Sequence, residues 1–289
     1  MTQLGLEGMP KRLFACTPSR LTGWGDCPRR YRMTYLDRPA PQKGPPWAHN
    51  TVGAVVHLAL ARWWGLPRER RHPAAARGLL DAAWKTNGFS GDAQAEQWRA
   101  YAGEMVEGYA ATLDPDDEPL GVERTVSVKS AVLAVSGRVD RIDLRGGEVV
   151  VVDYKTGRST LTQDDARGSL ALALYALACA RTLRRPCVAV ELHHLPTGRV
   201  LRWEHTQQGL ERHLRRAEAL GQEAAAAAEA LQEGGDADTL FPARPGRQCG
   251  WCDLVRVCPA GTAQVRAPQQ PWAGLADPVP GPEALRPTG

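Results

Sequence analysis

The chain has 289 residues, of which 43% are hydrophobic and 24% charged, a composition typical of a globular protein with one or two domains. No uncharged apolar run reaches the roughly 18 residues of a membrane span, and residues 1–14 contain no apolar signal segment. We therefore expect a cytoplasmic protein that does not contact a membrane. The formal net charge of +4 is too small to indicate a nucleic-acid-binding protein by itself.

The net charge hides an uneven distribution along the chain. The first 80 residues contain 13 Lys and Arg residues against 4 Asp and Glu residues, whereas residues 81–150 contain 7 against 13. A basic segment beside an acidic one suits a site that binds both phosphate and a cation. A solvated basic face would explain the same numbers.

The predicted elements form a helical first part and a mixed second part. In the first part, the apolar spacing predicts helices over residues 20–36, 51–64, 73–85 and 92–113. From residue 121 the hydrophobic period changes to two, which predicts strands over 122–128, 131–144, 148–155, 187–195 and 200–205. Two further helices are expected over residues 164–182 and 207–233.

Three segments are expected along the chain. Residues 1–16 are predicted to be a flexible N-terminus, and residues 17–262 a single domain. Residues 263–289 are predicted to be a disordered tail, because residues 267–289 contain six prolines and little apolar content.

A predicted β-hairpin places two carboxylates opposite each other. Gly146 and Gly147 fit the two central positions of a type I′ turn, which need positive φ. With that turn, Asp140 faces Asp153, and Lys155 lies on the same face of the hairpin. A register slipped by one residue would instead put the two aspartates on opposite faces.

The paired aspartates need something to offset their repulsion, either a proton or a cation. A hard divalent ion such as Mg²⁺ or Mn²⁺ suits carboxylate oxygens. Lys155 is one of only five lysines among 36 basic residues, so its place beside the aspartates suggests a need for a compact ammonium group. Such a group could hold an attacking water or stabilise charge on a phosphate.

The segments Gly-Arg-Val-Asp-Arg-Ile-Asp (137–143) and Val-Val-Asp-Tyr-Lys-Thr-Gly (151–157) resemble the core of RecB-like exonucleases of the PD-(D/E)XK nuclease superfamily. Residues 51–57, which end at His57, match the helical histidine motif of that family. The resemblance implies an α/β fold with a mixed central sheet flanked by helices, a helical N-terminal part and a C-terminal iron–sulfur segment. It also implies that His57, Asp140 and Asp153 bind the metal and that Lys155 assists the water.

Two further residues are assigned through the same resemblance. Glu123 matches an acidic residue on the preceding strand and receives a supporting role. The family usually carries Gln four residues before a Tyr on the helix after the core. Here Tyr175 is present, but Ala171 stands at the Gln position, which leaves cleavage efficiency and strand preference open.

Three of the seven cysteines lie close together near the C-terminus, at Cys249, Cys252 and Cys258. Three thiolates leave a metal centre one ligand short, and Cys27 is the best fourth because it also precedes a proline. RecB-like proteins of the AddB type and CRISPR-adaptation nucleases share this pattern around a [4Fe-4S] cluster. The resemblance thus implies a cluster that links the two ends of the domain, and structural Zn²⁺ is the alternative.

The basic segment around Cys27 could bind and stack single-stranded DNA through Arg29, Arg30, Arg32 and Tyr31. An amphipathic helix with a solvated arginine face is the competing interpretation. The chain contains no GxxxxGK[ST] phosphate loop, so any helicase that supplies its DNA would be a separate protein.

Together these features predict a Mg²⁺- or Mn²⁺-dependent DNA exonuclease that hydrolyses phosphodiester bonds. Its expected substrate is single-stranded DNA or DNA with free ends, in repair or recombination. The alternative function is a non-catalytic or weakly active, cluster-containing DNA-binding subunit of a helicase–nuclease or CRISPR-adaptation complex.

Overall fold

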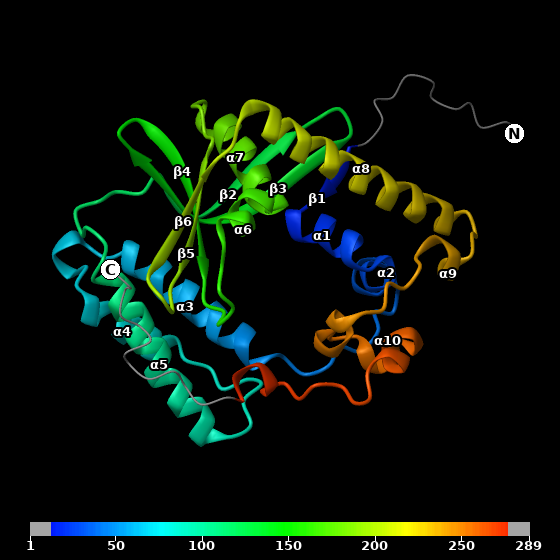
Figure 1. Ribbon diagram of the computed structural model, residues 1–289, viewed down its shortest axis with the longest axis horizontal. Coiled ribbons are helices and arrows are strands. Elements are labelled where there is room, and N and C mark those ends of the chain that lie inside the picture. The colour runs from blue at the N-terminus through cyan, green and yellow to red at the C-terminus, as the bar shows by residue number, and fades with distance from the viewer. Residues whose placement is uncertain (1–12, 277–289) are drawn as a thin grey trace, which may run out of the picture.

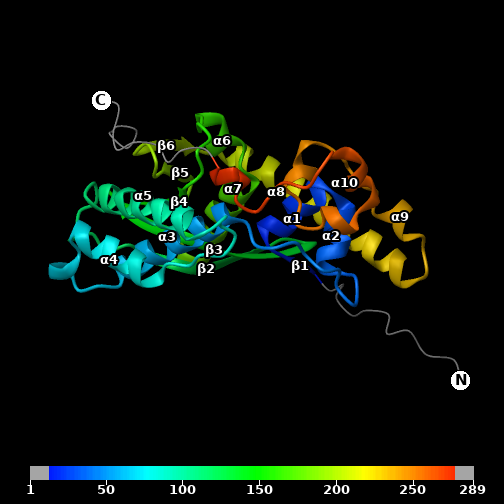
Figure 2. The same cartoon turned by 90° about the horizontal axis from the view of Figure 1, so that it is seen from below.

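The computed structural model describes residues 13–276. Residues 1–12 of the predicted flexible N-terminus and residues 277–289 of the predicted tail lie outside this range. A mixed β-sheet forms the centre, and helices cover both of its faces (Figures 1 and 2). No helix within residues 13–276 is long and apolar enough to cross a membrane.

The helices of the described chain lie mostly where the hydrophobic spacing predicts them. The α-helices are α1 (Pro18–Asp26), α2 (Pro28–Tyr35), α3 (Ala48–Trp64), α4 (Pro73–Ala83), α5 (Asp92–Ala110), α6 (Gln163–Gly168), α7 (Leu170–Leu183), α8 (Gln207–Gln232), α9 (Ala237–Leu240) and α10 (Pro259–Gln264). The 3₁₀ turns are η1 (Arg68–Arg70), η2 (Arg247–Trp251), η3 (Val255–Val257) and η4 (Ala273–Leu275).

The sheet has six strands, with the order β1-β3-β4-β5-β6 and with β2 paired to β3. Their bounds are β1 (Phe14–Cys16), β2 (Gly121–Lys129), β3 (Leu133–Arg145), β4 (Glu148–Lys155), β5 (Ala189–His194) and β6 (Arg199–Glu204). The β1–β3 and β4–β5 pairs are parallel, and the other pairs are antiparallel. The predicted mixed sheet is therefore confirmed.

The β3–β4 hairpin has the predicted register. Arg145 pairs with Glu148 and Arg141 with Val152, and Gly146 and Gly147 have φ values of +57° and +87°. Both glycines are required, because a two-residue turn of this type needs positive φ at each central position.

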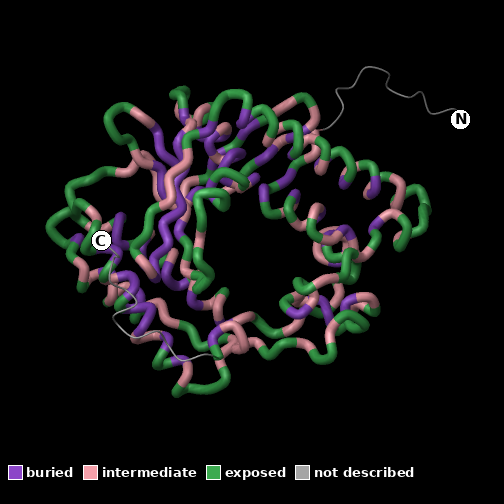
Figure 3. Tube along the Cα trace, viewed as in Figure 1, coloured by how far each residue is buried: buried purple, intermediate pink, exposed green. Residues whose placement is uncertain are grey.

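Two hydrophobic cores lie on opposite faces of the sheet, since successive side chains of a strand point to opposite sides. Val149 and Val151 of β4 pack with α7 in one core. Val150 and Val152 pack with α3, α4 and α5 in the other. Figure 3 shows the buried residues concentrated along the sheet and on the helix faces turned towards it. The strands of this central part are thus fixed from both sides.

Two predicted helices are each interrupted by one extended residue. Cys27 separates α1 from α2 with φ −162° and ψ 104°, because a residue before proline is disfavoured in the helical region. Ser169 separates α6 from α7, and its side chain accepts a hydrogen bond from the backbone N–H of Leu172. Each break places a polar side chain at the start of a new helix.

The end of the described chain differs from the predicted disordered tail. Residues 263–276 continue from α10 to η4, and Leu275 is 5% exposed in the core formed with α3 and α5. Its carbonyl oxygen accepts hydrogen bonds from Gln94 Nε2 (3.0 Å) and Trp98 Nε1 (3.2 Å). The prolines of this segment prevent a long helix but do not prevent packing. The N-terminal prediction also differs at residues 14–16, which form β1.

Candidate active site

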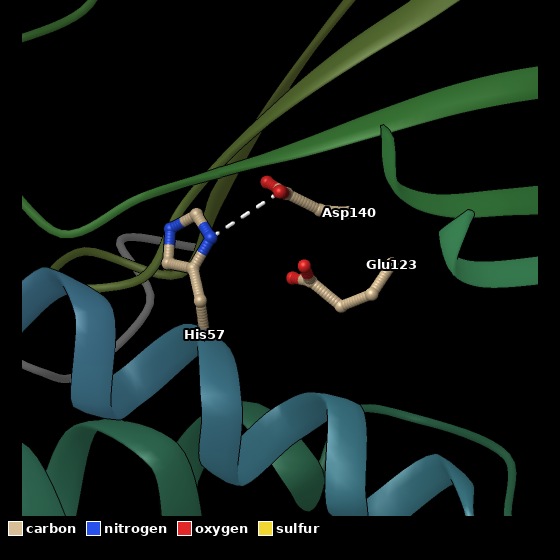
Figure 4. Close-up of side chains that lie close together, drawn as sticks. All are labelled: His57, Glu123 and Asp140. Carbon is tan, nitrogen blue, oxygen red and sulfur yellow. Dashed lines mark ion pairs between the residues drawn. The ribbon is translucent and has the colours of Figure 1, made fainter. Parts of the chain in front are cut away.

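Three potential metal ligands converge from three different elements. His57 comes from α3, Glu123 from β2 and Asp140 from β3, and one ligand atom of each lies within 4.8 Å of the others. His57 Nδ1 lies 3.3 Å from Asp140 Oδ1. Figure 4 shows the imidazole projecting from α3 towards the Asp140 carboxylate, with Glu123 alongside. Two carboxylates and an imidazole form a donor set suited to a divalent ion.

The strand register explains why Glu123 and Asp140 meet. The β2–β3 ladder pairs Val122 with Arg141 and Arg124 with Val139, so Glu123 falls opposite Asp140. Glu123 has a positive φ of 49°, a conformation that is uncommon for residues other than glycine. The sequence between β2 and β3 contains no turn signal comparable to Gly146–Gly147, so the register of this pair is not predicted from the sequence.

Asp153 and Lys155 lie at the end of β4, beside the Asp140 position of β3. Lys155 Nζ lies 2.6 Å from Asp153 Oδ2. The Asp153 side chain is 19% exposed and that of Lys155 is 45% exposed, so the ammonium group faces solvent while the carboxylate is largely covered. Asp153 is not part of the group of atoms within 4.8 Å that His57, Glu123 and Asp140 form.

The local charges show that the site carries excess negative charge. Burial raises the pKa of Glu123 above its ordinary value; Arg138 opposes this shift and Asp140 adds to it. Burial likewise raises the pKa of Asp153, with Lys155 opposing and Asp140 adding to the shift. Such carboxylates are stabilised by a cation bound between them.

The pKa of the His57 imidazole is also raised, which favours its positively charged form beside these carboxylates. Burial by itself lowers the pKa of His57, but the hydrogen bond and charge of Asp140, with the charges of Asp153 and Glu123, raise it above its ordinary value. A positive charge is therefore favoured at this position, whether a proton or a metal ion supplies it.

The site opens into a cleft of about 1120 Å³. His57 and Glu123 line it, and α3 forms one wall over the length from His49 to Trp64. Arg62 and Arg138 line it as well, and Arg138 forms an ion pair with Glu123. Neither arginine is distinguished by its sequence context, although Arg138 stands two residues before Asp140 on the same strand.

These features match a known family. Residues 15–259 match the model of the PD-(D/E)XK nuclease superfamily. The chain belongs to this superfamily. No curated protein matches the chain. Among solved structures, a candidate exonuclease from Eubacterium rectale is similar, with a TM-score of 0.44 and 12% identity over 81% of this chain and 88% of that chain.

A buried network supports the nuclease site from behind. Arg141, next to Asp140, is 3% exposed. Its guanidinium pairs with Asp143 at 2.9 Å and donates hydrogen bonds to the hydroxyls of Tyr109 (3.2 Å) and Tyr154 (3.4 Å). The network joins β3, β4 and α5, and so restrains the strands that carry the aspartates. Asp143 therefore has a structural role, as the partner of the buried Arg141.

Helix α7 crosses the nuclease sheet at Gly137 of β3. A Cβ atom at Gly137 would lie 2.6 Å from Cε1 of Tyr175, so only glycine permits this close packing. Burial raises the pKa of Tyr175 to about 12, and the charges of Asp153 and Asp140 add to the shift. Tyr175 and Ala171 both line a separate hollow of about 460 Å³. Ala171, at the position where RecB-like exonucleases usually carry Gln, therefore faces open space.

The four cysteines predicted to bind a cluster line one cavity of about 60 Å³. Cys27 and Cys258 each precede a proline, have extended backbones and stand at the start of a helix, α2 and α10 respectively. No three of their sulfur atoms lie within 4.8 Å of one another. Within residues 13–276, His57, Glu123 and Asp140 form the one group of three or more potential ligands inside 4.8 Å.

The predicted basic DNA-binding residues have partners within the protein. Arg29 Nη2 lies 3.0 Å from Asp238 Oδ1, and Arg32 Nε lies 3.2 Å from Asp37 Oδ1. Arg30 is more accessible, with a side chain that is 46% exposed. Arg30 also has a partner, since its Nε lies 3.7 Å from Asp253 Oδ1. All three arginines therefore form ion pairs within the protein, and Arg30 is the most exposed of them.

The position of Tyr31 contradicts its predicted role as a stacking residue. Tyr31 is 1% exposed, its hydroxyl accepts a hydrogen bond of 3.0 Å from Arg20 Nε, and its ring packs edge-on against Trp24 at 5.5 Å. No face of this ring is open to a DNA base. The alternation of aromatic and basic residues in this helix reflects its amphipathic packing.

Proposed function

We propose that this protein is a metal-dependent DNA exonuclease that hydrolyses phosphodiester bonds. The observation that supports the proposal best is the convergence of His57, Glu123 and Asp140. The first two line the cleft, and the Lys155–Asp153 pair lies at the adjoining strand end. Membership of the nuclease superfamily supports the reaction class. DNA as substrate, action from a free end, and a role in repair or recombination rest on the RecB-like sequence motifs.

His57, Glu123, Asp140 and Asp153 are the residues that would hold Mg²⁺ or Mn²⁺. When bound, such an ion polarises a phosphoryl oxygen and lowers the pKa of a coordinated water. Asp140 is oriented for this role because its Oδ2 accepts a hydrogen bond of 2.8 Å from the Tyr154 backbone N–H. Its Oδ1 is thereby directed towards His57.

Lys155 provides the positive charge that the reaction needs on the solvent side of the carboxylates. Its stem is fixed by β4, and its ammonium group contacts Asp153. From this position it donates hydrogen bonds to the attacking water or to a non-bridging phosphate oxygen, where negative charge develops in the transition state. Arg138 and Arg62 attract the phosphate backbone into the cleft.

A [4Fe-4S] cluster held by Cys27, Cys249, Cys252 and Cys258 is part of the proposal, with structural Zn²⁺ as the alternative. Four sulfurs around Zn²⁺ at about 2.3 Å would lie about 3.8 Å apart. No three cysteine sulfurs of the described chain come within 4.8 Å of one another, so the preference for the cluster over Zn²⁺ rests on the sequence pattern of one early and three late cysteines. The cavity lies between the α1–α2 junction and residues 249–258, so the cluster would tie these distant segments together.

The metal content has a direct test. The protein is purified without oxygen, and iron, acid-labile sulfide and zinc are measured per chain. We expect about four irons and four sulfides, and a colourless protein with one zinc and no iron would contradict the cluster.

The activity is tested with linear single-stranded and double-stranded DNA labelled at the 5′ or the 3′ end, with Mg²⁺, Mn²⁺ or EDTA. We expect short products from linear DNA with either metal and none with EDTA. Circular single-stranded DNA is the matched substrate without ends, and its cleavage at the same rate would contradict exonuclease action. Binding of DNA without cleavage under every condition would favour a non-catalytic subunit that serves a separate helicase.

A further inference from the structure

Trp251 is an exposed aromatic side chain in a chain that buries most of its large hydrophobic residues. Within the described residues, five large hydrophobic side chains are strongly exposed, and Trp251 is the aromatic one among them, at 44%. It lines the same cleft as His57 and Glu123. An exposed indole in a substrate cleft is a surface on which a planar ligand can stack.

The indole of Trp251 is held in place by residues from two other segments. Its ring lies 5.8 Å from that of His49, at an interplanar angle of 77°, and 5.4 Å from that of Trp47, at 53°. On another side, a Cβ atom built on Gly274 would lie 3.5 Å from Trp251 Cζ3 and 3.0 Å from His49 Nδ1. The indole is therefore ordered before a ligand binds, which reduces the entropy lost on stacking.

The distance from Trp251 to the metal ligands follows from helix α3. His49, which contacts Trp251, precedes His57 by eight residues on this helix, which corresponds to about 12 Å along its axis. Stacked nucleotides of one strand rise about 3.4 Å each. The span from His49, which contacts Trp251, to His57 thus corresponds to a few nucleotides of a bound strand.

We propose that Trp251 stacks on an unpaired nucleobase of a DNA strand whose scissile phosphate lies at the metal ligands. The proposal rests on the proposed nuclease function and names its substrate as single-stranded DNA, because a paired base has both faces covered within the duplex. The arginines of the cleft contact phosphates without regard to sequence. The aromatic contact holds the strand in register while it moves towards the carboxylates.

This assignment also gives the cysteine segment a place in substrate binding. Trp251 lies between Cys249 and Cys252, in the turn η2. The residues that would hold the metal centre thus position one wall of the cleft. The segment is then more than a structural link between the chain ends.

Binding of a fluorescein-labelled 15-nucleotide oligo(dT) in EDTA tests the contact without cleavage. For Trp251→Ala we expect the Kd to rise about 5- to 150-fold, the range for losing one base–aromatic stack. Trp251→Phe should retain most of the affinity, because it keeps an aromatic face. Val257→Ala is the matched control: Val257 is also 44% exposed and belongs to the same segment, but it does not line the cleft.

A second measurement uses the unaltered protein and so does not depend on the folding of a variant. One abasic nucleotide is moved through the oligonucleotide, and wild-type affinity should fall at one position. The same abasic change should cost nothing further in Trp251→Ala, because the stack is already lost. Equal affinity of Trp251→Ala and wild type, or no sensitive position in wild type, would overturn the proposal.

The outcome is separable from that of the proposed catalysis. Position-dependent stacking by a wild type that never cleaves DNA would retain the Trp251 assignment and reject the enzymatic function. Cleavage by the wild type, together with DNA binding that Trp251→Ala leaves unchanged, would retain the enzymatic function and reject the Trp251 assignment.

Discussion

Asp140 accepts a 2.8 Å hydrogen bond at Oδ2 from the backbone N–H of Tyr154, the residue that follows Asp153. A side chain of β3 thus takes the place of a backbone acceptor at the end of the β3–β4 ladder, whose last backbone pair towards the site is Arg141 with Val152. The hydrogen bond ties Asp140 to the backbone next to Asp153, and it leaves Asp140 Oδ1 for His57. Asp140 therefore has a structural and a chemical role at once.

Substitutions at Asp140 should separate these two roles. Asp140→Asn keeps an oxygen acceptor for Tyr154 N–H, whereas Asp140→Ala leaves that donor unpaired. We expect the Ala variant to be about 1–3 kcal/mol less stable than the Asn variant in urea unfolding. Both should lose more than about 100-fold in metal-dependent cleavage, because both lack the carboxylate charge. Equal stability of the two variants would show that the hydrogen bond contributes nothing.

Lys155→Ala should lower the rate of DNA cleavage about 100- to 10,000-fold, because it removes the ammonium group beside Asp153. Its effect on the free energy of unfolding should stay within about 0.5 kcal/mol, since the side chain is 45% exposed. Lys129→Ala, at an exposed position on β2, is the control and should cleave like the wild type. Cleavage by Lys155→Ala at the wild-type rate would reject the proposed mechanism.

Cys27→Ala should destabilise the whole fold, because Cys27 would hold the metal centre from the N-terminal side. We expect loss of the bound metal and a fall in Tm on the order of 10 °C, or about 3 kcal/mol for a chain of this size. Cys16→Ala is the matched control, since Cys16 is buried in a different core and is not near the cavity. A melting curve of Cys27→Ala that coincides with that of Cys16→Ala would contradict the role of Cys27.

Leu275→Ala should cost about 2–4 kcal/mol of unfolding free energy, because Leu275 is 5% exposed in the core with α3 and α5. Leu144→Ala, at a position that is 40% exposed, should cost no more than about 0.5 kcal/mol. Urea titrations of both variants provide the comparison. A small effect at Leu275 would mean that residues 263–276 do not pack in solution.

We expect the free energy of unfolding to fall on the acid side of neutrality because of His205. Burial, with a smaller effect from the charge of His213, lowers the pKa of His205 from 6.5 to about 4. The unfolded chain therefore binds a proton between these pH values while the folded chain does not, so stability is lost as the pH falls from about 6.5 to about 4. The contribution is on the order of 3 kcal/mol, and urea titrations at several pH values should show a shallower loss for His205→Gln.

The sequence determined the hairpin and its register because both depend on local rules. Gly146 and Gly147 fix the turn, and the alternation of strand residues then places Asp140 towards Asp153 and Lys155 beside it. The helix of His57 follows from its apolar spacing in the same way. These features need only the geometry of one element or of one turn.

The tertiary structure decided which distant residues share the site. Glu123 joins His57 and Asp140 through the pairing of β2 with β3, and Trp251 reaches the cleft only because residues 249–252 pack against the start of α3. Tyr31, which the sequence pattern predicted to stack on DNA bases, is buried by contacts with Arg20 and Trp24. Periodicity in the sequence states which face of an element is apolar, but only the packing of elements decides which faces remain open to a substrate.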